Sequence, residues 1–227
     1  TTDAQDRRAY CRGHPILSHE SGVANRASQI AGLDTRDTRL TEIVAQTLDE
    51  ARTLGATQAE AAINVSQGLA VTVRLGEVET LEHTRDKGLG VTVYFGNRTG
   101  SASTTDFRSE AVRDTVRAAC SIARFTAVDE CAGLADPERL ARTIPELDLY
   151  HVWNPGADRA IELAAGCEAA ARATDKRITN SEGATLSTHE GVEVYGNTHG
   201  FIGRLAGIRH SMSAAVIAQD ASGMQRD

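Results

Sequence analysis

The sequence predicts an α+β protein in which antiparallel β-meanders pack against helices. Residues 85–96 (RDKGLGVTVYFG) join a charged, glycine-containing turn to a strand of β-branched and aromatic residues. Residues 191–200 (GVEVYGNTHG) repeat much of this phrase later in the chain. Segments with apolar residues at helical spacing precede each copy. The repeat also suggests a duplicated α+β unit, followed by the start of a second, β-rich domain.

Three segments have helical periodicity. Residues 41–54 carry one apolar face and end at Gly55, a natural stop for a helix. Residues 109–125 and 157–174 each place Val, Leu, Ala or Cys along one side. These segments predict the helices that cover the meanders.

The strands are expected to be short, because glycine and turn residues interrupt them repeatedly. Gly88 supplies the positive φ of a hairpin turn at 85–88, and His189 and Glu190 lie in a second turn. The predicted strands are 59–66, 69–76, 78–84, 89–95, 101–105, 178–188, 191–196, 200–206 and 208–219.

The chain divides into three predicted regions. Residues 1–40 are polar and aperiodic, and we interpret them as a weakly ordered N-terminal arm. Residues 41–200 form the α+β domain, and 201–227 begin a truncated C-terminal β-rich domain. Within the α+β domain, the stretch 126–156 holds three of the four prolines, so it is predicted as an irregular crossover with one short helix near 136–142.

Composition excludes several classes of function. The net charge of −7 disfavours a nucleic-acid surface, which needs clustered Lys and Arg. No apolar stretch is long enough to span a membrane. The four cysteines form no C-x-x-C pair, which favours a reducing cytoplasm over a disulfide framework. Because aromatic residues make up only 4% of the chain, its core must be built from Val, Ile, Leu and Ala.

Catalytic motifs are incomplete. A zincin helix needs H-E-x-x-H, and neither His19-Glu20 nor His189-Glu190 is followed by the second histidine. The sequence contains no G-x-S-x-G elbow and no P-loop. Two of the four cysteines, Cys120 and Cys167, lie on the apolar sides of predicted helices, where a thiol is usually buried and inert.

The predicted strands offer backbone edges. Residues 71–75 and the meander at 89–105 could accept an extended peptide by strand addition, in which main-chain hydrogen bonds supply the affinity. The same edges could instead pair within the fold or in an oligomer. The residues alone leave both readings open.

Several segments together resemble the TldD/PmbA family, and most closely its PmbA branch, also called TldE, the modulators of DNA gyrase. The resemblance covers about residues 41–227 and rests on the order and spacing of short phrases: 85–96 (RDKGLGVTVYFG), 100–107 (GSASTTDF), 131–136 (CAGLAD), 148–151 (DLYH), 180–184 (NSEGA), 195–201 (YGNTHGF) and 223–227 (GMQRD).

The resemblance implies a cytoplasmic heterodimer that degrades or processes unfolded peptides. A TldD-like partner would carry zinc on an H-E-x-x-x-H helix and perform the hydrolysis. The PmbA-like subunit would lack catalytic and metal-ligating residues and would help form the cavity that admits peptides. In this chain, Lys87, His189 and His199 are the candidate contacts to peptide or partner, each expected at a turn.

Two alternatives stay open beside this leading hypothesis. One is a protein-binding modulator module related to gyrase, without a peptidase role and without direct contact to nucleic acid. The other is a self-sufficient hydrolase that uses Cys131 or an N-terminal Thr1 as its nucleophile. Whether the chain is itself an enzyme is therefore undecided by its sequence.

Overall fold

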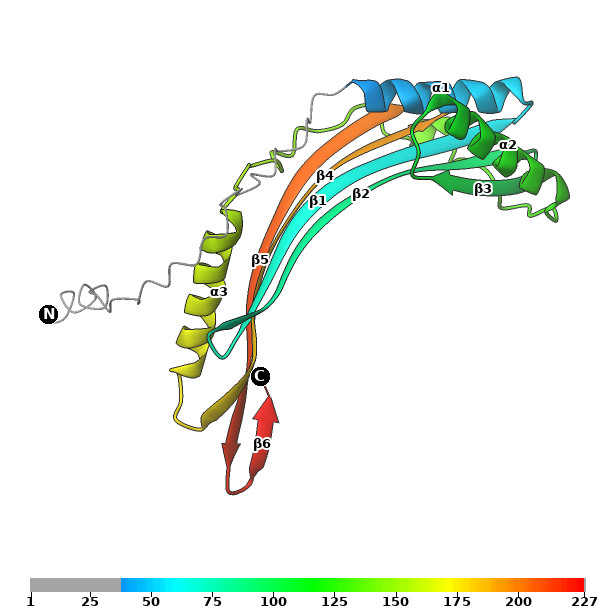
Figure 1. The fold of residues 1–227 in the computed structure, drawn as a ribbon. Helices are drawn as coiled ribbons and strands as arrows, with labels where there is room; N and C mark the ends of the chain where they lie inside the picture. The colour runs from blue at the N-terminus through cyan, green and yellow to red at the C-terminus, as the bar shows by residue number, and fades with distance from the viewer. Residues whose placement is uncertain (1–37, 227) are drawn as a thin grey trace, which may run out of the picture.

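The computed structural model describes residues 38–226 as one curved antiparallel sheet with helices along its outer side (Figure 1). The helices are α1 (Arg39–Thr53), α2 (Ser109–Phe125) and α3 (Gly156–Arg172). The strands are β1 (Gln58–Arg74), β2 (Glu77–Phe95), β3 (Arg98–Thr104), β4 (Ile178–Asn197), β5 (Ile202–Asp220) and β6 (Gly223–Arg226). Their order across the sheet is β3-β2-β1-β4-β5-β6, and each neighbouring pair is antiparallel. The predicted α+β class is confirmed, and all but the last three residues of the predicted arm lie outside the described residues.

The helices follow the sequence prediction closely. The second predicted helix coincides with α2, and the bounds of the other two differ from α1 and α3 by one or two residues. A single 3₁₀ turn, Pro137–Arg139, stands where a short helix was expected near 136–142. Helical spacing is a reliable signal here because one side of each helix faces the sheet.

Four of the predicted strand breaks, those inside β1, β2, β4 and β5, are wrong. The strands expected at 59–66 and 69–76 are one strand, β1, and those at 78–84 and 89–95 are β2. The predicted turn at 85–88 therefore lies inside β2, where Gly88 pairs with Asn64. His189 and Glu190 likewise lie inside β4, and β5 joins the strands expected at 200–206 and 208–219. The real turn between β1 and β2 is at Leu75 and Gly76, which both have positive φ.

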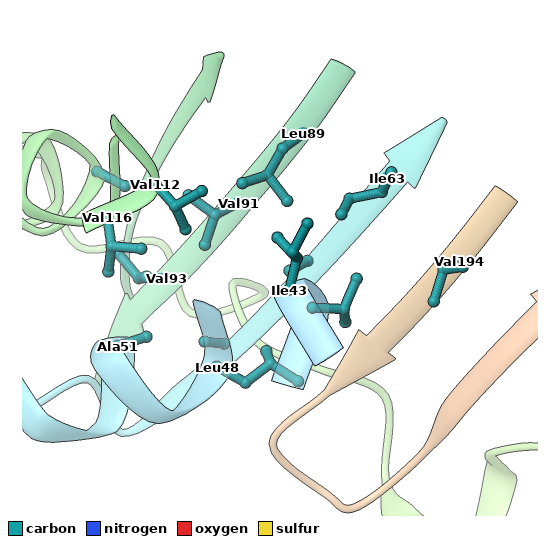
Figure 2. Close-up of a cluster of buried hydrophobic side chains, with 14 of the residues drawn as sticks. Ile43, Leu48, Ala51, Ile63, Leu89, Val91, Val93, Val112, Val116 and Val194 are labelled. Carbon is teal, nitrogen blue, oxygen red and sulfur yellow. The ribbon is translucent and has the colours of Figure 1, made fainter. Parts of the chain in front are cut away.

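A hydrophobic cluster joins α1 and α2 to one end of the sheet. Figure 2 shows Ile43 and Leu48 of α1 over Ile63 of β1 and Val194 of β4, beside Val91 of β2. These side chains are at most 7% exposed. Full burial of one such side chain is worth about 1.5–3 kcal/mol, so this cluster is a main source of stability for the fold.

A second, smaller cluster lies under α3. It consists of Leu69, Val71 and Val73 of β1 with Leu186 of β4 and two alanines of the helix, Ala160 and Ala164. A polar row on the same face of the sheet lies between the two clusters. In this row, Gln67 bonds to both Arg85 and Glu190, and Tyr150 donates a hydrogen bond of 2.8 Å to Glu190.

The strands on either side of residue 200 are paired. β4 and β5 form a continuous antiparallel ladder from Ile178 with Ala218 to Gly196 with Ile202. The predicted division of the chain at residue 200 thus falls in a hairpin turn, and as a division of the whole protein it stays a prediction. The crossover segment follows the outer edge of β5, where the Ile208 N–H donates to the Leu149 carbonyl at 2.8 Å.

The two copies of the repeated phrase lie on either side of β1. The first occupies the end of β2 and the second the end of β4, and both strands run antiparallel to β1. Because β2 is the second strand of its meander and β4 the first of the other, the copies do not hold equivalent places in a duplicated unit. What the two copies share is that each pairs with β1.

Candidate functional site

The inner face of the curved sheet, opposite the helices, is polar. Along β1, odd-numbered residues from Ala59 to Val73 pack toward the helices and all but the half-buried Val65 are buried, so even-numbered residues face inward. Hydroxyl pairs join neighbouring strands on this inner face: Thr92 with Ser101 at 2.9 Å, Thr72 with Thr185 at 2.9 Å, and Ser187 with Ser211 at 2.7 Å. No helix of the described residues covers this face (Figure 1).

A carboxylate held by two tyrosines lies near one end of the inner face. Tyr94 donates to one oxygen of Glu60 at 3.2 Å, and Tyr195 donates to the other at 2.8 Å. These are the tyrosines of the two repeated phrases, and β1 presents Glu60 between them. The sequence prediction missed this cluster, although the tyrosine common to both copies was a signal that could have found it.

The two phenols are held in their protonated form. Burial, helped by the adjacent Glu60 carboxylate, raises the pKa of Tyr94 to about 12. Burial also raises the pKa of Tyr195, with Glu60 acting in the same direction. The buried Asn197 donates to the Tyr195 oxygen at 3.4 Å. The proton of Tyr195 is therefore directed at Glu60.

A hollow of about 540 Å³ opens beside this cluster. Its lining comes from β1, β2, β3 and β4, and includes Glu60, Thr92, Ser101 and Tyr195. Gly90 forms part of its floor, and a Cβ added there would meet no atom within 4 Å. The glycine thus leaves room above the sheet that no neighbouring side chain of the described residues fills.

One long strand segment is paired on a single side. β2 pairs with β1 along nearly its whole length, but with β3 only from Leu89 to Phe95. Residues 77–88 therefore present a free backbone edge among the described strands, and almost all of them are exposed. For residues 71–75, the alternative of pairing within the fold is confirmed, because β1 lies between β2 and β4. In the meander at 89–105, the edge strand is the short β3.

The three predicted contact residues lie apart from one another. Lys87 is inside β2 on the helix-covered face, with its ammonium 5.1 Å from the centre of the Phe107 ring. His189 is inside β4 on the inner face and is exposed. Only His199 lies at a turn, between β4 and β5, where its N–H donates to Asn197 at 3.0 Å. The structure does not assemble them into one site.

The cysteines and potential metal ligands form no centre in the described part of the chain. Cys120 is buried on α2 as predicted, and burial raises the pKa of its thiol. Cys167 is only partly buried, and Cys131 is exposed in the crossover. Within residues 38–226, no group of three or more His, Cys, Asp or Glu side chains is placed to hold a metal ion. Thr1, the other predicted nucleophile, lies outside these residues.

Two family models match the chain. The model of the PmbA/TldA metallopeptidase domain 1 matches residues 59–123, and that of the PmbA/TldA metallopeptidase central domain matches residues 150–227. Together they account for more than half of the chain. The chain belongs to the PmbA/TldD family. The first match includes β1, β2 and β3 with most of α2, and the second includes α3 and the remaining strands.

Curated members of the PmbA/TldD family resemble the chain over most of its length. It is 50% identical over 169 residues to Metalloprotease PmbA of Escherichia coli O157:H7, a match covering 74% of this chain and 38% of that relative. It is 40% identical over 195 residues to the Metalloprotease PmbA homolog of Haemophilus influenzae, covering 86% of this chain and 43% of the relative. The chain thus spans about two fifths of these relatives.

Solved structures of the family share the fold. A Bacteroides thetaiotaomicron protein, named as a modulator of DNA gyrase, matches with a TM-score of 0.72 at 25% identity, over 82% of this chain and 42% of its own. TldE from Thermococcus kodakarensis matches with a TM-score of 0.64 at 17% identity, over 80% of this chain and 40% of its own. Among the described residues, no helix has both the length and the apolar character required to cross a bilayer.

Proposed function

We propose that this chain is part of a PmbA/TldE-like subunit of a zinc-dependent peptidase complex in the cytoplasm, which degrades or processes unfolded peptides. A TldD-like partner supplies the zinc and the hydrolysis, and this subunit supplies a wall of the chamber that holds the peptide. The family membership and the metalloprotease names of the relatives support this assignment.

The observation that carries the proposal is the open inner face next to an unpaired strand edge. Residues 77–88 of β2 offer main-chain donors and acceptors on one side, so an extended chain can add there as a further strand. Recognition through the backbone is largely independent of sequence, which suits a subunit that admits unfolded peptides. Lys87 lies on this edge segment, and His189 lies on the inner face.

Zinc would lower the pKa of its bound water and polarise the scissile carbonyl in the partner. The described residues of this chain do not fit such a centre, and no step of hydrolysis is assigned to them. Their part is to bind and orient the peptide. His199 lies in the β4–β5 turn, where it would contact the partner or the peptide.

The test is a peptidase assay on an unfolded peptide, using the full-length protein with and without a TldD-type partner, and with zinc content measured in parallel. We expect activity and zinc only when the partner is present. Lys87→Ala and His189→Ala should raise KM in the complex, while Arg117→Ala on the exposed side of α2 serves as the control.

Activity or stoichiometric zinc in the protein alone would contradict the proposal. Recovery of gyrase without any TldD-like protein in a pull-down would favour the other function, a protein-binding modulator, for which the name of the Bacteroides thetaiotaomicron structure is the supporting observation.

A further inference from the structure

The hollow on the inner face is lined by the hydroxyls of Thr92, Ser101 and Ser103, and at Glu60 it presents only acceptors of hydrogen bonds. Both phenol protons point at Glu60, so Tyr195, the tyrosine that lines the hollow, offers a ligand the lone pairs of its oxygen. An ionised carboxylate accepts about four hydrogen bonds, and the two tyrosines use two of them. A ligand that bonds to Glu60 must therefore bring donors.

The charge of Glu60 is also uncompensated locally. Among the described residues, no Lys, Arg or His nitrogen lies within 4 Å of its carboxylate oxygens. The carboxylate is half-buried, so its attraction for a cation is less screened than at the surface.

The shape of the hollow selects for a side chain rather than a bare ion. The hollow has a volume of about 540 Å³ and is lined by residues of the strands. Ala62 and Gly90 form part of its floor, and their small size adds to its depth. An extended peptide that crosses the inner face could thus insert one long side chain into the hollow, with its end near Glu60. Lysine and arginine combine that length with several N–H donors.

We propose that the hollow bounded by Glu60, Tyr195, Thr92 and Gly90 is a binding pocket for a lysine or arginine side chain of an extended peptide. This inference rests on the proposed function for its peptide ligand. It assigns to the subunit a preference that binding through a strand edge alone would not give. The pocket discriminates by charge, because an uncharged side chain leaves the half-buried carboxylate without a counter-ion.

The test measures binding by calorimetry, without catalysis, on the full-length protein. Two short capped peptides are compared, identical except for one central lysine in the first and norleucine in the second. We expect the lysine peptide to bind about tenfold more tightly, which corresponds to one charged hydrogen-bonded contact. Equal affinities for the two peptides would overturn the inference even if the complex proves to be a peptidase.

Two variants locate the effect. Glu60→Gln keeps an acceptor for one tyrosine, offers an NH2 donor to the oxygen of the other, and removes the charge, so it should reduce the preference for lysine to within about twofold. Its control, Glu193→Gln, makes the same change on the inner face of β4, outside the hollow and the 77–88 edge, and should retain the full preference.

Gly90→Val fills the hollow without touching the carboxylate. A Cβ at Gly90 meets nothing within 4 Å, so the fold should tolerate valine at this position. The added side chain would occupy the space above the sheet that a ligand needs. We expect loss of lysine-dependent binding, with unchanged binding in Gly166→Val, whose Cβ is equally unobstructed but lies on α3, away from the hollow and from the 77–88 edge. Retained preference in Gly90→Val would refute the pocket, and because this variant leaves Glu60 intact, the conclusion does not depend on how Glu60→Gln folds.

Discussion

Single residues decide where the sheet turns, and Glu168 is the clearest case. This glutamate on α3 is 2% exposed, and its two oxygens accept the N–H groups of Leu75 at 2.7 Å and Gly76 at 2.9 Å. Leu75 has a φ of 52°, which is unfavourable for leucine. The carboxylate therefore fixes a strained turn that the local sequence would not adopt alone.

Replacing Glu168 with Ala should lower the free energy of unfolding by about 3 kcal/mol, because two turn N–H groups lose a charged acceptor. Urea unfolding of the full-length protein measures the loss. Glu162→Ala, on the exposed side of the same helix, should cost far less. Equal losses in both variants would show that helix propensity, and not the turn, is responsible.

The contribution of Glu168 should also depend on pH. Burial alone would raise the pKa of its carboxyl, but hydrogen bonds from Ser181, Leu75 and Gly76 outweigh burial and lower it. A carboxyl with a lowered folded-state pKa stabilises the fold above its unfolded pKa, and this stabilisation is lost as pH falls through the folded value. The difference in unfolding free energy between wild type and Glu168→Gln should thus shrink under acid conditions. A difference that grows as pH falls would contradict this assignment.

At the scale of elements, close packing of α2 on β3 depends on Gly100. A Cβ at this position would lie 2.3 Å from the Ala119 carbonyl oxygen and 2.4 Å from the Ala123 nitrogen. Because these are backbone atoms, the helix itself would have to move.

Gly100→Ala should therefore destabilise the fold by about 1–3 kcal/mol, the usual cost of overpacking. Thermal unfolding of the full-length protein is the measurement. Gly90→Ala on the neighbouring strand meets nothing within 4 Å and is the matched control, expected to be neutral or slightly stabilising. Comparable loss in both variants would mean that α2 does not rest on β3 at this distance.

Elements also show how much of the fold could be predicted from sequence. Helix α2 was predicted to the residue, because its buried stripe repeats at helical spacing. The strands were divided at glycines that lie inside them, such as Gly68, where a Cβ would come within 2.9 Å of the Thr188 carbonyl oxygen. Gly68 thus permits a close approach of two strands and does not mark a turn. The real turn at Leu75 depends on Glu168, a contact across 93 residues that no local pattern reveals.

The candidate site likewise depends on contacts between residues far apart in the sequence, which local patterns do not reveal. Lys87 and His189 were expected at turns that do not exist, and they lie on opposite faces of the sheet. Glu60 was missed because its partners Tyr94 and Tyr195 reach it only through pairing of three strands. The repeat that contains both tyrosines was visible, but its meaning depends on β1 lying between the two copies.

At the scale of the whole molecule, the one-sided pairing of β2 should be visible in hydrogen exchange. In residues 77–88, the amides that point away from β1 have no strand partner among the described residues, whereas β1 is paired on both sides. We expect β1 to exchange slowly throughout and the 77–88 segment to exchange fast at alternate positions. Mass spectrometry with fragment resolution provides the measurement.

An added unfolded peptide should slow exchange in 77–88 and leave α3 unchanged. Uniformly slow exchange in this segment of the isolated full-length protein would instead show that another part of the protein already covers the edge. That result would remove the main support for strand addition.

The central place of β1 has a consequence for biogenesis. Thr72 and Thr185, bonded across β1 and β4, are 113 residues apart. At usual rates of translation, β1 and its hairpin leave the ribosome roughly 10 s before β4 follows. During that interval the edge that β4 will occupy is open, and it carries alternating Val, Ile and Leu. A nascent chain of this protein is therefore expected to need protection, by a chaperone or by delayed folding, until the second meander has been made.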